Sequence, residues 1–208
     1  MPALLRAMSE VTPDDSINES SGVFCFYFRG VVLMSIPLFL MYFVDVPVVN
    51  QLSMRNGEMN CAVAVATMVY SYFGYDVNYN ELVPVLREGI PVTHGISLSE
   101  IIEHTPGVTD GRWSARFEWT DPKFFQRKVE TELTSDRPVI VAVQNGTWLG
   151  WDFEEAHSLV IIGMDETHFY YIDPYGGIHR RIEIEKFINQ VGLWPDHKNA
   201  LLMFEKAK

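Results

Sequence analysis

The sequence contains few of the residues on which several classes of protein depend. Cys25 and Cys61 are the only cysteines among 208 residues, too few for a disulfide-stabilised scaffold. Neither C-x-x-C nor H-E-x-x-H occurs, so the strongest sequence signatures of a bound metal are missing. We therefore predict no metal site and no cofactor, and each cysteine needs an explanation of its own.

Basic residues are also scarce. Sixteen Lys and Arg stand against 27 Asp and Glu, which gives a net charge of −11. A nucleic-acid-binding protein needs a basic face, so this charge argues against nucleic acid as a partner. It also argues against attachment to anionic lipid by charge alone. The hydrophobic share of 48% and the charged share of 21% indicate a folded domain rather than a disordered acidic chain.

The chain has no clean apolar run of membrane-spanning length. Residues 23–44 are strongly apolar, but Arg29 and Pro37 interrupt them and leave 14 uncharged residues at 31–44. Three interpretations stay open: a membrane anchor, an uncleaved or atypical signal, and a start codon assigned too early. We favour membrane association, because so dense an apolar run is costly to expose. Localisation is accordingly membrane-associated or exported through this segment, and otherwise cytoplasmic.

These features divide the chain into a polar tail at 1–22, the apolar segment at 23–44 and a domain at 45–208. A first strand is expected at 41–49, and residues 61–73 predict a helix buried on nearly all sides that ends before Gly74. Further helices are expected at 81–89, from the capping box at 97–100, and at 122–133 after Asp121. Strands follow at 138–143, 158–164, 168–173, 178–184 and 199–205, with a short helix at 185–190. Helices first and an antiparallel meander afterwards predict the α+β class.

Cys61 begins the predicted buried helix. Unpaired N–H groups and the partial positive charge of a helix N-terminus stabilise a thiolate and offer donors to an oxyanion. His157 and Asp173 lie 16 residues apart on two strands joined by a short turn, so a hairpin makes them neighbours. Asp173 can then fix the imidazole tautomer while the other nitrogen takes the Cys61 proton. Gln51, ten residues before Cys61, could supply a second oxyanion donor.

The segment before His157 is rich in aromatic and acidic residues. Trp148 and Trp151 stand among glycines, where they could line a substrate cleft as readily as pack within a loop. Asp152, Glu154 and Glu155 place negative charge next to His157. We therefore predict substrate contacts from these five residues and a preference for a basic or amine-bearing substrate.

Several sequence blocks resemble papain-like peptidases of the bacteriocin-processing, double-glycine type. In order, they are V-P-V-V-N-Q, N-C-A-V-A-V-A-T-M-V-Y-S-Y-F-G, R-P-V-I-V-A-V, A-H-S-L-V-I-I-G-M-D and F-Y-Y-I-D-P-Y-G-G, with N-A-L-L-M-F-E as closing strand. The resemblance covers roughly residues 45–206. It implies a papain-like fold, with the nucleophile helix packed on a C-terminal antiparallel sheet. It also implies Cys61 as nucleophile, His157 as base, Asp173 as the orienting group and Gln51 in the oxyanion hole.

The sequence departs from that family at two positions and lacks an ATP-binding motif. Ala62 stands where the family usually has glycine, and Asn60 where it often has an acidic residue. No G-x-x-x-x-G-K-[ST] motif accompanies the domain, and the chain is too short for a fused exporter. The resemblance therefore implies a standalone domain, to which cleavage of double-glycine leaders is not carried over.

We predict a thiol-dependent hydrolase that cleaves a peptide or other amide bond through an acyl-enzyme. One alternative is an acyltransferase or transglutaminase-like enzyme with the same triad, in which an amine replaces water as acceptor. The other is a catalytically silent papain-like binding domain, which the absence of glycine after Cys61 favours. The sequence indicates neither the substrate, nor the biological process, nor the oligomeric state.

Overall fold

The computed structural model describes residues 24–28, 31–35, 41–53, 57–152 and 154–208, so the polar tail expected at 1–22 lies outside the described residues. Its helices are α1 (Cys61–Tyr72), α2 (Tyr79–Leu86), α3 (Leu98–Val108), α4 (Pro122–Thr134) and α5 (Ile184–Lys186). Shorter helical turns are η1 (Gln51–Ser53), η2 (Gly57–Met59), η3 (Gly146–Leu149) and η4 (Phe187–Val191). The strands are β1 (Phe24–Phe28), β2 (Val31–Ser35), β3 (Tyr42–Phe43), β4 (Trp113–Thr120), β5 (Val139–Val143), β6 (His157–Met164), β7 (His168–Asp173), β8 (Ile178–Glu183) and β9 (Asn199–Lys206).

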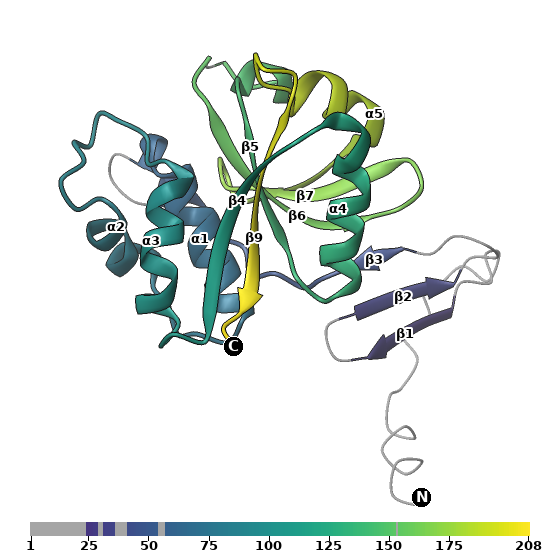
Figure 1. Cartoon of the computed structure of the whole chain (residues 1–208), viewed down its shortest axis with the longest axis horizontal. Helices are drawn as coiled ribbons and strands as arrows, with labels where there is room; N and C mark the ends of the chain where they lie inside the picture. The colour runs from purple at the N-terminus through teal and green to yellow at the C-terminus, as the bar shows by residue number, and fades with distance from the viewer. Residues whose placement is uncertain (1–23, 29–30, 36–40, 54–56, 153) are drawn as a thin grey trace, which may run out of the picture.

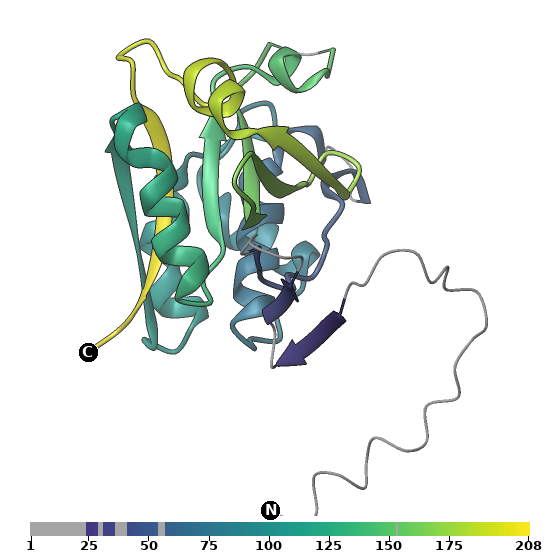
Figure 2. The same cartoon turned by 90° about the vertical axis from the view of Figure 1, so that its right-hand side faces the viewer.

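The architecture is a curved antiparallel sheet with helices on both sides (Figures 1 and 2). Its strand order is β4-β9-β5-β6-β7-β8, and β3 pairs with the far end of β6. Helix α1 packs on β6, and α4 packs on β6, β5 and β9. Every residue of β6 is buried, as expected for a strand covered on both faces. The predicted α+β class and the helix-on-sheet packing are confirmed.

Helix α1 is buried because of its composition. From Cys61 to Tyr70 all ten residues are buried, and small Ala side chains alternating with Val let the helix lie close to the sheet. The Ala/Val alternation could also have formed a strand. The length of the run and the following Gly74, which has a φ of +90°, favour the helix that is observed.

One strand departs from the predicted order. Residues 113–120 form β4, which precedes α4 and pairs along its whole length with β9. The expected meander is present as β5-β6-β7-β8, but β4 comes before α4 in the chain, and β9 lies between β4 and β5 rather than after β8. Arg116 and Glu118, which form an ion pair on the exposed face, dilute the apolar signal of this edge strand.

The described residues of the apolar segment predicted at 23–44 form three strands. β1 and β2 form an antiparallel pair that runs from Phe24 opposite Ser35 to Phe28 opposite Val31. β5 pairs with residues 157–161 of β6, and β3 pairs with the next part of the same strand, where Phe43 lies opposite Gly163. Among the helices of the described ranges, none is long and apolar enough to cross a membrane. Membrane association through this segment stays a prediction.

Candidate active site

Cys61 occupies the N-terminus of α1, where the helix abuts β6. Its side chain is 9% exposed. Burial raises the pKa of the Cys61 thiol, but hydrogen bonding to His157, attraction to its charge, and hydrogen bonds from Ser158 outweigh burial and leave the pKa below its ordinary value. The geometry therefore favours the thiolate, which is the nucleophilic form of cysteine.

His157 begins β6 and lies between the thiol and a carboxylate. With Val160 opposite Ile172, the ends of β6 and β7 bring His157 and Asp173 diagonally across from each other. The distance from His157 Nε2 to Asp173 Oδ1 is 2.8 Å, which leaves Nδ1 for the thiol of Cys61. Burial lowers the pKa of His157, yet the contacts with Asp173 and Cys61 raise it to about 9. The two groups therefore favour each other's charged form: His157 lowers the pKa of Cys61, and Cys61 raises that of His157.

Asp173 is fully buried, and each of its oxygens has a hydrogen-bond donor. Oδ1 accepts from His157 and from the backbone N–H of Tyr175 at 3.0 Å. Oδ2 accepts from Trp151 Nε1 at 2.7 Å, with Arg180 Nε 3.8 Å away. Because both carboxylate oxygens are held by donors, Asp173 fixes the orientation of the His157 imidazole toward Cys61.

Trp151 makes contacts that its sequence context does not reveal. Its indole contacts two side chains: the Tyr175 ring centroid is 4.6 Å from that of Trp151, and the Arg180 guanidinium carbon is 4.5 Å from the Trp151 ring centroid. Arg180 also donates from Nη1 to the carbonyl of Leu149 at 3.3 Å. These contacts surround the indole whose N–H donates to Asp173 Oδ2.

Gln51 is completely buried in η1, and its amide is already engaged. Nε2 donates to the carbonyl oxygens of Gly57 at 3.2 Å and Glu58 at 3.1 Å. Gly57 has to be glycine here, because a Cβ would lie 1.9 Å from the Gln51 carbonyl oxygen. The amide thus ties together the loop that leads to Cys61. For Gln51 to donate to an oxyanion, one N–H has to leave its carbonyl partner.

A buried arginine fixes the turn directly before the cysteine. Asn60 does not cap α1 with its side chain; its Oδ1 accepts from Arg87 Nε at 2.6 Å instead. The same guanidinium donates to the carbonyls of Met59 at 2.7 Å, Pro91 at 2.9 Å and His94 at 3.0 Å. Arg87 therefore joins the cysteine turn to the loop before α3, and the first N–H groups of α1 stay clear of a capping side chain.

A cavity of about 530 Å³ opens beside the Cys61–His157 pair. Its walls come from the start of α3, from β4, from the ends of β5 and β9, and from Trp194. None of the five residues predicted to contact substrate belongs to its lining among the described residues. Asp152, Glu154 and Glu155 are exposed, so their carboxylates face solvent.

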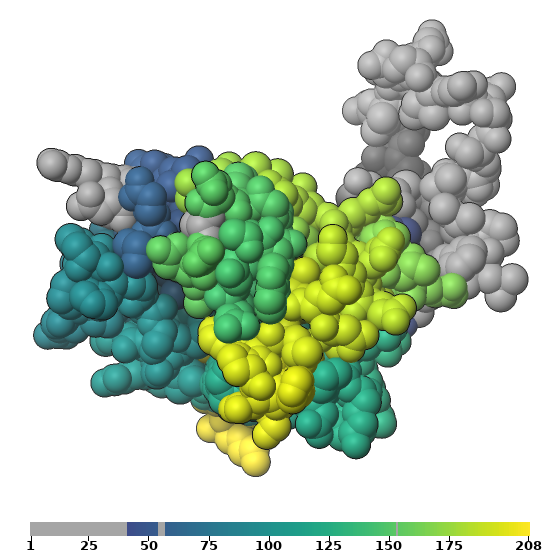
Figure 3. Space-filling model, turned by 90° about the horizontal axis from the view of Figure 1, so that it is seen from above, coloured from purple at the N-terminus to yellow at the C-terminus, as the bar shows by residue number. Residues whose placement is uncertain are grey.

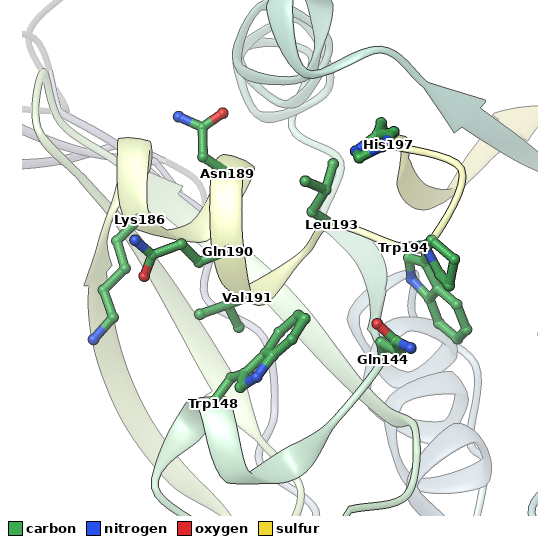
Figure 4. A pocket seen from close by; sticks show the side chains of 10 residues that line it. Gln144, Trp148, Lys186, Asn189, Gln190, Val191, Leu193, Trp194 and His197 are labelled. Carbon is green, nitrogen blue, oxygen red and sulfur yellow. The ribbon is translucent and has the colours of Figure 1, made fainter.

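Trp148 belongs to a second cavity, of about 480 Å³. Trp148 of η3 faces Gln190 and Val191 of η4 across this space, with Gln144 and Trp194 on its other side (Figure 4). η3 contacts η4 at the end of the molecule that Figure 3 shows. Substrate contacts from Trp148 and from the other four residues, and the preference for a basic or amine-bearing substrate, stay predictions.

Three contacts of the site were missed at the level of sequence. Ser158 gave one weak signal, its position next to His157. Arg87 and Arg180 gave no sequence signal, because only the tertiary fold brings their side chains next to the site. Within the described ranges, no three His, Cys, Asp or Glu side chains cluster closely enough to hold a metal ion.

A thiol at the start of a helix, next to an imidazole and a carboxylate on the antiparallel sheet that the helix packs against, is the arrangement of papain-like cysteine hydrolases. The chain belongs to the Peptidase_C39 like family, which matches residues 43–200. The resemblance seen in the sequence is thereby confirmed, and the protein is a cysteine peptidase-like enzyme, a hydrolase with a peptide as substrate.

Two solved structures share this fold. A putative C39-like peptidase from Bacillus anthracis matches with a TM-score of 0.61 and 16% identity, over 81% of this chain and 99% of that one. The peptidase domain of Streptococcus ComA, a bi-functional ABC transporter involved in a quorum-sensing pathway, matches with a TM-score of 0.53 and 17% identity, over 76% of this chain and 96% of that one. No curated protein sequence matches significantly.

Proposed function

We propose that Cys61, His157 and Asp173 form the catalytic triad of this peptidase and that the reaction proceeds through an acyl-enzyme. The Cys61 thiolate attacks the scissile carbonyl, and the N–H groups at the start of α1, with Gln51, receive the oxyanion. His157 donates its proton to the leaving amine, and the C–N bond breaks. Water, losing a proton to His157, then attacks the thioester, the C–S bond breaks, and the acid and the Cys61 thiolate are released beside a protonated His157.

One observation carries the proposal. The carboxylate, imidazole and thiol lie in a continuous row, and the pKa of Cys61 falls while that of His157 rises. A cysteine with a purely structural role at a helix start does not require a hydrogen bond to a histidine that a buried aspartate orients. The pair therefore supports an active thiolate over the catalytically silent binding domain.

The test is limiting alkylation with iodoacetamide at pH 6, with the adduct located by mass spectrometry. At this pH a free thiol is less than about 1% ionised, so Cys61 should react on the order of a hundred times faster than glutathione. His157→Ala should abolish the difference. His168→Ala is the matched control, because His168 is a strand histidine that contacts Thr167 at 2.8 Å rather than the site.

Equal labelling of Cys61 and glutathione would contradict the proposal. Product analysis separates hydrolysis from transfer: peptide cleavage in the presence of added methylamine should yield the free acid. A methylamide as main product would instead support the acyltransferase alternative.

A further inference from the structure

The cavity beside Cys61 is walled mainly by aliphatic and aromatic side chains. They come from three separate parts of the fold: the start of α3, strand β4 and the segment before β9. The largest are Ile96, Leu98, Ile102, Phe117, Trp119 and Trp194. Among the described lining residues, the only ionisable groups are those of Cys61 and His157. The other polar side chains are serine hydroxyls, which carry no charge.

The aromatic wall of the cavity is built before any substrate arrives. Phe117 and Trp119 meet edge to face with centroids 5.0 Å apart, and Trp119 meets Trp194 in the same way at 5.6 Å. Trp194 is itself fixed, because its Nε1 donates to the carbonyl of Ala142 at 3.0 Å. Trp119 nevertheless stays 47% exposed. A rigid, exposed aromatic surface next to a nucleophile is typical of a binding site rather than of a core.

We propose that this cavity binds a bulky apolar side chain, such as Phe, Leu or Met, within two residues of the scissile bond. The inference rests on the proposed function, since a carbonyl held at the Cys61 sulfur brings its flanking side chains to the cavity mouth. A charged side chain would lose hydration there without finding a counter-charge. Glycine on both sides of the bond would leave the aromatic wall in water. The cavity therefore selects for apolar bulk.

The first experiment measures binding in the cavity without needing turnover. Cys61 is alkylated with N-benzyl iodoacetamide and with iodoacetamide, and each rate is divided by the rate of the same reagent with glutathione. The measured ratio is the first of these relative rates over the second. Burial of the phenyl ring should make the benzyl reagent roughly tenfold faster in relative terms. A ratio near one would overturn the proposal. Loss of the activated thiolate would slow both reagents equally, so failure of the proposed function would leave the ratio unchanged.

Two variants assign the effect to the cavity. Trp119→Ala should bring the benzyl-to-plain reagent ratio close to one, while Phe124→Ala should leave it unchanged. Phe124 is the matched control because it is 46% exposed and lies on α4, away from the site. Ser99→Glu is a second cavity variant, which tests the proposal even if Trp119→Ala fails to fold. Ser99 lies at the exposed start of α3, where a carboxylate favours the helix, and it lines the cavity. It should also lower the ratio.

The second experiment determines cleavage sites in a proteome-derived peptide library by mass spectrometry. Phe, Leu or Met should be enriched several-fold at one of the two positions on either side of the cut, and Trp119→Ala should remove that enrichment. Enrichment of glycine at the positions flanking the cut, or no preference at all, would overturn the proposal. Complete lack of cleavage by a protein with normal Cys61 labelling would instead contradict the hydrolase.

Discussion

The proton shared by Cys61 and His157 predicts how activity depends on pH. The pKa of His157 is raised to about 9, so the imidazolium persists well above neutrality and its loss ends general-acid catalysis near pH 9. The pKa of Cys61 is lowered, so kcat/KM should rise at a pH below the pKa of an ordinary thiol. kcat/KM against pH should therefore form a bell with its alkaline limb near 9. A single rising limb near pH 8.5 would contradict the ion pair.

Trp151 tests whether orientation of the carboxylate matters. Trp151→Phe keeps an aromatic ring in contact with Tyr175 and Arg180 but removes the N–H that donates to Asp173 Oδ2. We expect kcat to fall about tenfold, as for the loss of one oriented hydrogen bond to a charged group, with KM little changed. Steady-state kinetics should show this fall. Trp113→Phe is the control, because Trp113 stacks on Phe73 away from the triad.

Arg87 tests the rigidity of the cysteine turn. Arg87→Met leaves Asn60 Oδ1 and three carbonyls without their donor, so the free energy of unfolding should fall by about 2–4 kcal/mol. Loss of the nearby cation should also raise the pKa of Cys61 and slow its alkylation at pH 6. Arg87→Lys should restore the alkylation profile more fully than the stability.

The control for Arg87 is Arg116→Met. Arg116 is also paired, with Glu118 and Glu205, but its side chain is 46% exposed on β4. Exposed pairs contribute little, so its loss should cost less than about 1 kcal/mol and leave Cys61 reactivity unchanged. Equal effects of the two variants on alkylation would show that Arg87 does not act on the cysteine.

At the scale of elements, Gly163 decides how β3 joins the sheet. A Cβ at this position would lie 2.6 Å from the Phe43 ring and from the Tyr42 carbonyl, at the point where the pairing of β6 and β7 is irregular. Gly163→Ala should lower the free energy of unfolding by about 1–3 kcal/mol in chemical denaturation, because the backbone contact cannot yield easily.

Gly107 provides the opposite case. It lies in α3, is exposed, and a Cβ there would meet no atom within 4 Å. Gly107→Ala should leave stability unchanged or raise it by about 0.5–1 kcal/mol, since alanine reduces the entropy lost on helix formation. A loss of stability in both alanine variants would contradict the role assigned to Gly163.

The helices and most strands could be predicted because their signals are local. The buried run before Gly74, the Ser97 cap and the Asp121-Pro122 start each indicate an element without reference to the rest of the chain. β4 was not predicted, although Trp113, Ala115, Phe117 and Trp119 do alternate with polar residues. Its apolar positions are only half covered, because the strand lies at an edge, and a half-buried strand gives a weak pattern.

At the scale of the whole molecule, the start of the folded unit can be tested by truncation. Residues 42–44 belong to the sheet: Val44 is 2% exposed and its N–H donates to Ile162. Removal of residues 1–40 should leave Cys61 alkylation and the unfolding midpoint close to those of the full chain. Removal of residues 1–46 should lower stability by about 2–4 kcal/mol, because two buried valines and a β6 pairing are lost.

The sequence by itself determined the identities and order of Cys61, His157 and Asp173, the helix that begins at the cysteine and the hairpin that carries the other two. These depend on local periodicity and on spacing along the chain. Only the tertiary structure decided what surrounds them: Arg87 behind the cysteine, Trp151 on the aspartate, and the apolar cavity at the thiol. Each of these contacts joins residues more than 20 positions apart. Their pairing therefore depends on how the helices and the sheet pack, which no local pattern records.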